Sequence, residues 1–368
     1  MAQISAVVGA RPNFMKMAAL LDEIRRRPQI KARLIHTGQH YSPEMSATFF
    51  DELGMPEPDV NLEVGSGSHT AQTAAIMTKL ESDFLAHRPD LVLVVGDVNS
   101  TMAAALVAAK LGIPVAHVEA GLRSFDRGMP EEINRLVTDT LSDYLFASEP
   151  SAVRNLRAEG VPQEKTFLVG NVMIDTLLKF RDKAAKTSVL ERLGLQPQGY
   201  CVATLHRPSN VDDLGRLAGL VRMLSRLARR LPVVFPAHPR TKERMQAAGI
   251  PTDSLVLVPP MGYLEFLRLT SEARLVLTDS GGIQEETTIL GVPCLTLREN
   301  TERPATIESG TNRLVGTNPE TVLAAALETL DAPRPDARSR TPELWDGSAS
   351  ARILDVLESR FATAAAHA

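Results

Sequence analysis

The chain has 368 residues, of which 44% are hydrophobic and 23% charged, so its composition is that of a globular protein with two or three domains. Its 40 basic and 44 acidic residues give a net charge of −4, which provides no overall basic surface for nucleic acid or an anionic membrane. The 2 cysteines lie far apart, which argues against a disulfide framework or a structural zinc site. We recognise no signal peptide or spanning segment and expect a cytoplasmic protein.

Short β-branched apolar runs alternate along the chain with longer segments of helical periodicity, which is typical of parallel-sheet α/β domains. In the first half we expect strands at 4–8, 33–36, 91–95, 115–118, 144–147 and 167–169. The pattern changes to a charged helix and a Gly/Pro-containing stretch over 179–199. Strands then follow at 202–204, 233–236, 255–258, 275–278, 294–297 and 314–315, and a helix over 350–362 ends the chain.

These elements predict an α/β fold of two doubly wound, Rossmann-like domains, residues 1–178 and 199–345, followed by a C-terminal helix within 346–368 that can pack back on the first domain. Such sheets bind ligands outside the carboxyl ends of their strands, so we expect a central cleft lined by polar strand-end residues. The chain has no dinucleotide fingerprint, P-loop, HExxH or GxSxG motif, which removes NAD and several large enzyme classes.

The strongest motif joins a predicted buried strand to a helix through Asp279-Ser280-Gly281-Gly282. Small residues there let backbone N–H groups and the positive end of the helix dipole approach a phosphate, and Glu286, one turn on, can accept two ribose hydroxyls. Further cations at strand ends or loops suggest a diphosphate: Arg11, Lys16, His206, Arg207 and Arg303. A tight turn with solvated surface cations is the alternative.

Three carboxylates also follow predicted strands or start helices: Asp97, Glu119 and Glu131. Asp97 could instead cap a helix near Thr101, and Glu131 could answer a helix dipole. Glu119 follows an apolar segment, so it should be partly buried and needs a partner such as Arg123. With His206, these groups suit proton transfer on a sugar nucleotide.

A divalent metal is the competing use of such residues. The candidate ligands are Asp97, His117, Glu119 and His206. Their spacing fits no common ligand signature, and we expect no metal.

Several long motifs occur in a fixed order along the chain. They are Gly-Ala-Arg-Pro-Asn-Phe-Met-Lys (9–16), His-Thr-Gly-Gln-His (36–40), Gly-Asp-Val-Asn-Ser-Thr (96–101), His-Val-Glu-Ala-Gly-Leu-Arg-Ser (117–124), Pro-Glu-Glu-Ile-Asn-Arg (130–135), His-Arg-Pro (206–208), Asp-Ser-Gly-Gly-Ile-Gln-Glu-Glu (279–286) and Thr-Glu-Arg-Pro (301–304). With them, the chain resembles the non-hydrolysing UDP-N-acetylglucosamine 2-epimerases over nearly its whole length.

The resemblance implies a glycosyltransferase-B-type fold, a homodimer and interconversion of UDP-GlcNAc with UDP-ManNAc, an isomerase reaction of cell-surface polysaccharide biosynthesis that needs no cofactor. It implies a catalytic set of Asp97, Glu119, Glu131 and His206. Around the UDP-sugar it implies Arg11, Lys16, Arg123, Arg207, Phe266, Ser280, Gly281, Gly282, Glu286 and Arg303. Met261 departs from members that carry a glutamine near the base.

Many bacterial members bind a second UDP-GlcNAc as an activator. The matching positions here are Gln39, His40, Gln72, Arg207 and His238, but Ala71 stands where those members carry arginine. Two other activities remain open: a 2-epimerase of a UDP-diacetamido-uronic acid, and a UDP-sugar-dependent glycosyltransferase of the same fold. A nucleotide-sugar sensor without turnover is the remaining class.

Overall fold

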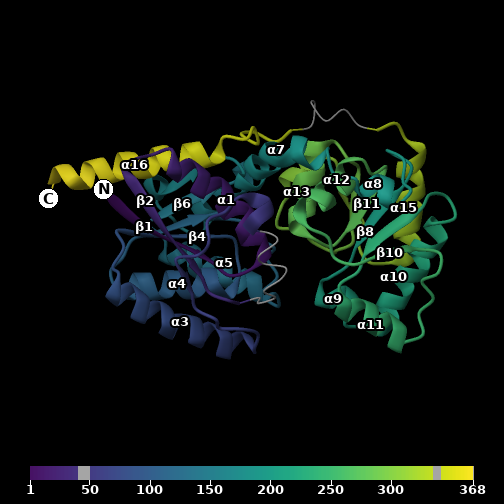
Figure 1. The fold of residues 1–368 in the computed structure, drawn as a ribbon, viewed down its shortest axis with the longest axis horizontal. Helices are drawn as coiled ribbons and strands as arrows, with labels where there is room; N and C mark the ends of the chain where they lie inside the picture. The colour runs from purple at the N-terminus through teal and green to yellow at the C-terminus, as the bar shows by residue number, and fades with distance from the viewer. Residues whose placement is uncertain (40–49, 335–340, 368) are drawn as a thin grey trace. The chain divides into compact units, whose positions relative to one another are not determined.

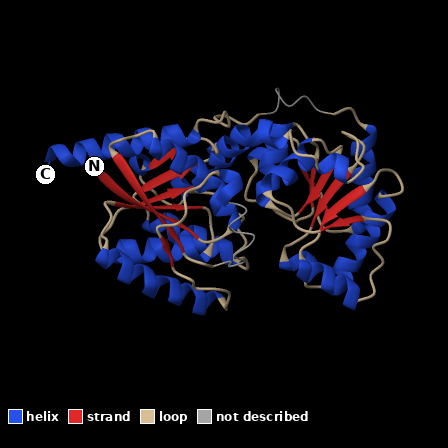
Figure 2. Ribbon diagram, viewed as in Figure 1, coloured by secondary structure: helices blue, strands red, loops and turns tan. Residues whose placement is uncertain are grey.

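The computed structural model describes residues 1–39, 50–334 and 341–367, and the chain divides into two compact units. Unit 1 comprises Met1–Lys179 and Glu343–Ala368, and unit 2 comprises Phe180–Pro342. In each unit a sheet lies between layers of helices (Figures 1 and 2). The two α/β domains expected from the sequence are therefore present.

Unit 1 is built on a seven-stranded parallel sheet with the strand order β3-β2-β1-β4-β5-β6-β7. Its strands are β1 (Ala2–Val8), β2 (Ile30–His36), β3 (Val60–Asn61), β4 (Leu91–Val95), β5 (Val115–Val118), β6 (Tyr144–Ala147) and β7 (Thr166–Leu168). Its helices are α1 (Arg11–Arg25), α3 (His69–Ala86), α4 (Asn99–Lys110), α5 (Pro130–Leu141), α6 (Pro150–Ala158), the short 3-10 helix η1 (Gln163–Lys165), the start of α7 (Val172–Ala184) and α16 (Ala349–His367). The two-residue strand β3 was not predicted, because two residues carry no periodicity.

Unit 2 has a six-stranded parallel sheet with the order β10-β9-β8-β11-β12-β13. Its strands are β8 (Cys201–Thr204), β9 (Val233–Pro236), β10 (Val256–Val258), β11 (Leu275–Thr278), β12 (Cys294–Thr296) and β13 (Asn312–Leu314). Its helices are α8 (Val189–Arg192), α9 (Pro208–Val211), α10 (Leu214–Leu227), α11 (Pro239–Ala247), α12 (Tyr263–Ser271), α13 (Gly281–Leu290), α14 (Ala305–Glu308) and α15 (Pro319–Asp331).

Central strands of both sheets are buried on both faces, as their continuous apolar runs predict. All five residues of β4 are buried, and on one face α3 packs against it through Ile76, Leu80 and Phe84. In unit 2 the apolar stripe of α10, which includes Leu217 and Leu224, packs with α15. Burial of such side chains contributes roughly 1.5–3 kcal/mol each.

The C-terminal helix α16 belongs to unit 1, although unit 2 separates it in sequence from the rest of that unit. Asp175 of α7 fixes the start of α16, since the Asp175 carboxylate accepts hydrogen bonds from the Ala349 and Ser350 amides at 3.1 and 2.7 Å. Arg27 then pairs with Glu358 of α16 at 2.6 Å. Within the described ranges, no helix combines the length and the apolarity needed to span a bilayer.

Candidate functional site

The predicted carboxylates of unit 1 lie beyond neighbouring strands of its sheet. β4 and β5 pair side by side, so Asp97 and Glu119, each following one of them, come to the same sheet edge. Both turns need unusual backbone, because Gly96 has φ +67° and Glu119 has φ +72°. A non-glycine residue in this left-handed region is uncommon, and such residues cluster at functional sites.

Glu119 is buried and pairs with a cation from another element. Its Oε2 lies 2.5 Å from Lys16 Nζ of α1, and only 3% of the Glu119 side chain and 5% of the Lys16 side chain are exposed. The prediction that Arg123 pairs with Glu119 was wrong, because the Arg123 guanidinium pairs with Asp139 at 2.7 Å and with Glu159 at 2.6 Å. The reason is geometric, since the turn through Gly121 carries Arg123 toward α5 and α6 instead.

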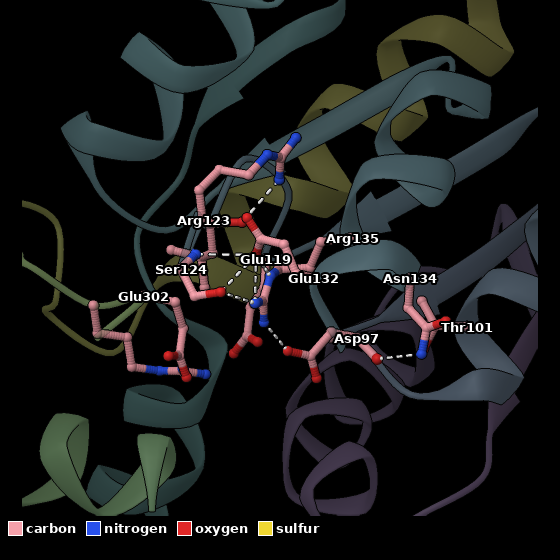
Figure 3. Close-up of polar contacts among 12 residues, drawn as sticks. Asp97, Thr101, Glu119, Arg123, Ser124, Glu132, Asn134, Arg135 and Glu302 are labelled. Carbon is pink, nitrogen blue, oxygen red and sulfur yellow. Dashed lines mark hydrogen bonds and ion pairs between the residues drawn. The ribbon is translucent and has the colours of Figure 1, made fainter. Parts of the chain in front are cut away.

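Asp97 is held by α5 (Figure 3). Its carboxylate pairs with Arg135, and Asn134 donates to its backbone carbonyl at 2.9 Å. The alternative role as a helix cap is wrong, because α4 begins at Asn99 with Val98 in the cap position. Since 28% of the Asp97 side chain stays exposed, its carboxylate can meet a ligand.

Glu132 fixes the loop between β5 and α5. Its carboxylate accepts hydrogen bonds from the amides of Ser124 and Phe125 at 3.0 and 2.9 Å and from Arg135 Nε at 2.9 Å. Burial opposes its charge, but the Ser124 amide and the Arg135 guanidinium outweigh that effect and lower the pKa of Glu132. Glu131, the predicted catalytic residue, is half-buried in the first turn of α5.

α5 therefore buries a polar face, which the sequence analysis missed. Glu132, Arg135 and Asp139 follow one another at spacings of three and four residues and are all buried, whereas Ile133 is 41% exposed. This is the reverse of an ordinary amphipathic helix. The sequence alone could not have singled out Arg135 and Asp139, because a polar stripe at this spacing is typical of a solvent-facing helix side and only the structure shows that it is buried.

In unit 2, His206 lies just beyond β8 and faces Asp279, which lies just beyond the neighbouring β11. His206 Nδ1 is 2.7 Å from Asp279 Oδ1, and 57% of the histidine side chain is exposed. Asp279 is fully buried and also accepts the Arg207 amide at 3.0 Å. Burial disfavours its charge, but the contact with His206 lowers the pKa of Asp279. No role for Asp279 was predicted from the sequence, although this residue begins the strongest motif.

The Ser280-Gly281-Gly282 turn starts α13 as predicted and lies against Arg303. A Cβ on Gly281 would come within 2.5 Å of Arg303 Nη1 and 2.8 Å of Glu302 Oε1, so any other residue there would have to displace the ends of these side chains. Arg303 pairs with Glu302 and, at 2.7 Å, with Glu285. Arg207 and Arg298 also pair with Glu302, at 3.5 and 2.7 Å.

The charges beside this turn are almost fully removed from water. Burial disfavours the charged form of Glu302, but the positive charge of Arg303 outweighs this effect and holds the pKa of Glu302 well below its usual range. Glu286 behaves in the opposite way, because burial, with the charge of Glu285 added, raises its pKa to about 7. A backbone turn at a helix N-terminus with guanidinium groups beside it is a suitable site for a phosphate group.

The remaining predicted residues fall into separate places. Gln39 and Gln72 in unit 1 are buried and hold loops, because Gln39 accepts the Ser100 amide at 3.0 Å and Gln72 donates to the Gln39 carbonyl at 3.1 Å. Phe266 on α12 is half-buried, and His238 in unit 2 is exposed and caps α11. The side chain of Arg11 and the whole of His40 lie outside what the structure describes. Among the described residues, no group of three His, Cys, Asp or Glu side chains could hold a metal ion.

Comparison with known proteins identifies relatives along nearly the whole chain. A family model described as UDP-N-acetylglucosamine 2-epimerase matches residues 22–358. The chain is 43% identical over 365 residues to the UDP-N-acetylglucosamine 2-epimerase of Methanocaldococcus jannaschii, covering 96% of this chain and 98% of the relative. It is 40% identical over 360 residues to the UDP-2,3-diacetamido-2,3-dideoxy-D-glucuronate 2-epimerase of Pseudomonas aeruginosa, covering 96% and 99%.

A solved structure agrees with these sequence relationships. The crystal structure of the Methanocaldococcus jannaschii UDP-GlcNAc 2-epimerase in complex with UDP-GlcNAc and UDP superposes with a TM-score of 0.90 at 42% identity. The match covers 97% of this chain and 99% of that chain.

Proposed function

Because the chain belongs to the UDP-N-acetylglucosamine 2-epimerase family, we propose that it interconverts UDP-GlcNAc and UDP-ManNAc by inverting C2 of the sugar. One observation of the structure supports this proposal most strongly. Two carboxylates, Asp97 and Glu119, stand beyond adjacent strands, each paired with a cation from a different helix. Paired carboxylates of this kind are suited to acid–base work on one carbon.

The chemistry of the substrate limits the mechanism. The C2 hydrogen of UDP-GlcNAc has no adjacent carbonyl, so its simple removal would leave an unstabilised carbanion. Loss of the C2 proton together with cleavage of the C1–O bond avoids this, because the electron pair forms the C1=C2 bond of a 2-acetamidoglucal and UDP leaves as the anion. Re-addition of UDP, with a proton delivered to the opposite face of C2, gives the epimer.

The residues divide between these tasks. We assign proton transfer to Asp97 and Glu119, with Glu131 and His206 completing the acid–base set. The turn at Ser280 to Gly282, with Arg303 and Arg207 beside it, would bind the diphosphate and stabilise the charge that grows on it as the C1–O bond breaks. Glu286, with its pKa raised to about 7, would bind the ribose hydroxyls.

A second substrate is favoured by the relative from Pseudomonas aeruginosa, whose name specifies a UDP-diacetamido-glucuronate. That sugar shares the C2 acetamido group and the C1–O–UDP bond, so the same elimination would apply. Incubation with UDP-GlcNAc alone, followed by NMR, tests the first proposal and should yield UDP-ManNAc. Turnover of the diacetamido-uronate only would favour the second, and sugar transfer to an added acceptor without epimer formation would contradict both.

We also propose that the active form is a homodimer and that the two units act as the acid–base and UDP-binding domains. The activator positions Gln39 and Gln72 already hydrogen-bond backbone groups, Gln39 at the start of α4 and Gln72 in loops, which argues against their binding a second nucleotide in this conformation. Light scattering of the purified chain tests the dimer. A linear dependence of initial rate on low UDP-GlcNAc concentration would fit the lack of activation.

A further inference from the structure

Beneath the two carboxylate turns lies a buried histidine that the assigned roles do not use. His117 is the third residue of β5 and is 1% exposed. Its Nδ1 lies 2.6 Å from Asp139 Oδ1, and its Nε2 lies 2.8 Å from the Gly96 carbonyl oxygen. Both ring nitrogens therefore face oxygen atoms at hydrogen-bond distance.

The identity of these oxygens decides where the protons are. A backbone carbonyl only accepts, so Nε2 must carry a hydrogen. Asp139 also accepts the Gly121 amide at 2.9 Å and faces Arg123 Nη1 at 2.7 Å, an environment that favours the carboxylate. Nδ1 then donates as well, which makes His117 an imidazolium. The buried cations His117 and Arg123 are balanced by Asp139 and Glu159.

This pair touches the backbone of both turns that carry the proposed acid–base groups. Gly96, whose carbonyl accepts from His117, immediately precedes Asp97. Gly121, whose amide donates to Asp139, follows Glu119 by two residues. Neither turn adopts an ordinary conformation, since Gly96 and Glu119 both have positive φ. Each turn therefore needs hydrogen bonds from its surroundings to hold it in place.

We propose that His117 and Asp139 are positioning residues that lock the Gly96–Asp97 turn and the Glu119–Gly121 turn into one geometry, and that His117 does so by donating a hydrogen bond from each ring nitrogen. The pair sets the separation of the two carboxylates on either side of C2 and touches no substrate itself. This inference rests on the proposed function for the roles of Asp97 and Glu119. The protonation state of His117 does not rest on it.

The kinetic test compares H117Q and D139N with D83N. Gln at position 117 cannot donate in both directions, so one turn is released. We expect kcat to fall roughly 10–100-fold, because small displacements of catalytic groups are costly. KM for UDP-GlcNAc and Kd for UDP should stay within about threefold of the wild-type values. Asn at position 139 can still accept from Gly121 and donate to a neutral His117, so D139N should lose less.

D83N is the matched control, because Asp83 also holds a cation of unit 1, Arg33, through two hydrogen bonds of 2.5 and 2.7 Å, but lies on α3 away from both turns. D83N should lower the melting temperature with kcat unchanged. A purely structural role for the pair would make H117Q and D139N behave like D83N, with kcat per folded molecule retained, and that result would overturn the proposal.

A spectroscopic test needs no turnover. In ¹⁵N-histidine-labelled wild-type protein, both His117 nitrogens should show attached protons and imidazolium shifts, and D139N should convert the ring to a neutral form. A wild-type His117 with one bare nitrogen would overturn the proposal whether or not the chain epimerises UDP-GlcNAc. Absence of turnover with the imidazolium present would contradict the proposed function alone.

Discussion

His117 in unit 1 and His206 in unit 2 both direct Nδ1 at a buried aspartate, at 2.6 and 2.7 Å. They differ in what surrounds the rest of the ring. His117 is 1% exposed and its second nitrogen is held by a backbone carbonyl, whereas 57% of the His206 side chain is exposed. The same pair of residue types thus buries the histidine ring against backbone in one unit and leaves the ring accessible in the other.

The strand ends around these histidines differ in the same sense. In unit 1 the site carries carboxylates, Asp97 and Glu119, each paired with one cation. In unit 2 it carries guanidinium groups held by Glu285 and Glu302 beside a glycine turn. Unit 1 should therefore affect the chemical step. Apart from His206, which belongs to the acid–base set, unit 2 should affect the binding of the nucleotide, so substitutions of the carboxylates and of the glycine turn should separate kcat from UDP affinity.

The largest effect is expected for D97N and E119Q. Each removes an acid–base group, so kcat should fall roughly 10²–10⁴-fold while UDP binds almost as tightly as to wild type. Steady-state kinetics with UDP-GlcNAc and calorimetric titration of UDP measure the two quantities. Wild-type kcat in both variants would return these carboxylates to a structural role and remove the difference between the units.

H206A should lower kcat by roughly 10²-fold, within the range of general acid–base groups. D279N should cost less, because the Asn side chain can still accept the Arg207 amide and orient the ring. Kinetics of the two variants, with UDP affinity measured alongside, test the order. If D279N is slower than H206A, the main role of Asp279 is to hold the backbone of this loop and not to orient the His206 ring.

Glu286 gives unit 2 a pH-dependent stability. Its pKa of about 7 in the folded chain lies above the ordinary value of 4.5, so the folded state favours the protonated form. The stabilising contribution of protonated Glu286 is therefore fully present below pH 4.5. It falls as the pH rises from 4.5 to 7 and is lost above 7, by about 3 kcal/mol in all. Urea unfolding without nucleotide should show this loss in wild type and not in E286Q. Parallel profiles for the two proteins would contradict it.

The smallest effect concerns the glycine turn. A Cβ in G281A would displace Arg303 and Glu302, so UDP affinity should fall about tenfold, near 1.4 kcal/mol. G281A is preferable to R303A as a test, because R303A would leave the carboxylates of Glu285 and Glu302 buried without the cation that pairs with them. G67A is the control, because a Cβ there meets no atom within 4 Å. Equal UDP affinity in G281A and G67A would place the anion site elsewhere.

Most of the fold could be predicted from sequence, because buried parallel strands are continuous apolar runs and helices follow them at regular spacing. β4, β5, β6, β9 and β11 match their predicted bounds. β3 was missed since its pairing to β2 is a tertiary contact of two residues. The last helix extends to His367, beyond the predicted end at 362, because the Ala-rich tail favours helix without an apolar pattern.

The candidate site was predictable in its residues but not in their pairing. Strand ends and motif order pointed to Asp97, Glu119 and the turn after β11. The partners came from elsewhere in the chain: Lys16 lies 103 residues from Glu119, and Arg135 lies 38 residues from Asp97. Local sequence favoured Arg123 for Glu119, but the positive φ at Gly121 redirects that side chain. The polar face of α5 could not be recognised as buried either, because its spacing is that of an ordinary solvent-facing helix side.

The most direct test of the proposed reaction follows both bonds at once. UDP-GlcNAc with oxygen-18 in the sugar–phosphate bridge is incubated with the enzyme in D2O and analysed by NMR. Elimination and re-addition predict solvent deuterium at C2 of both epimers and movement of the label to non-bridging phosphate positions, because the freed β-phosphate rotates before UDP returns. Epimer formation with neither deuterium uptake nor oxygen scrambling would contradict the elimination mechanism and the roles given to Asp97 and Glu119.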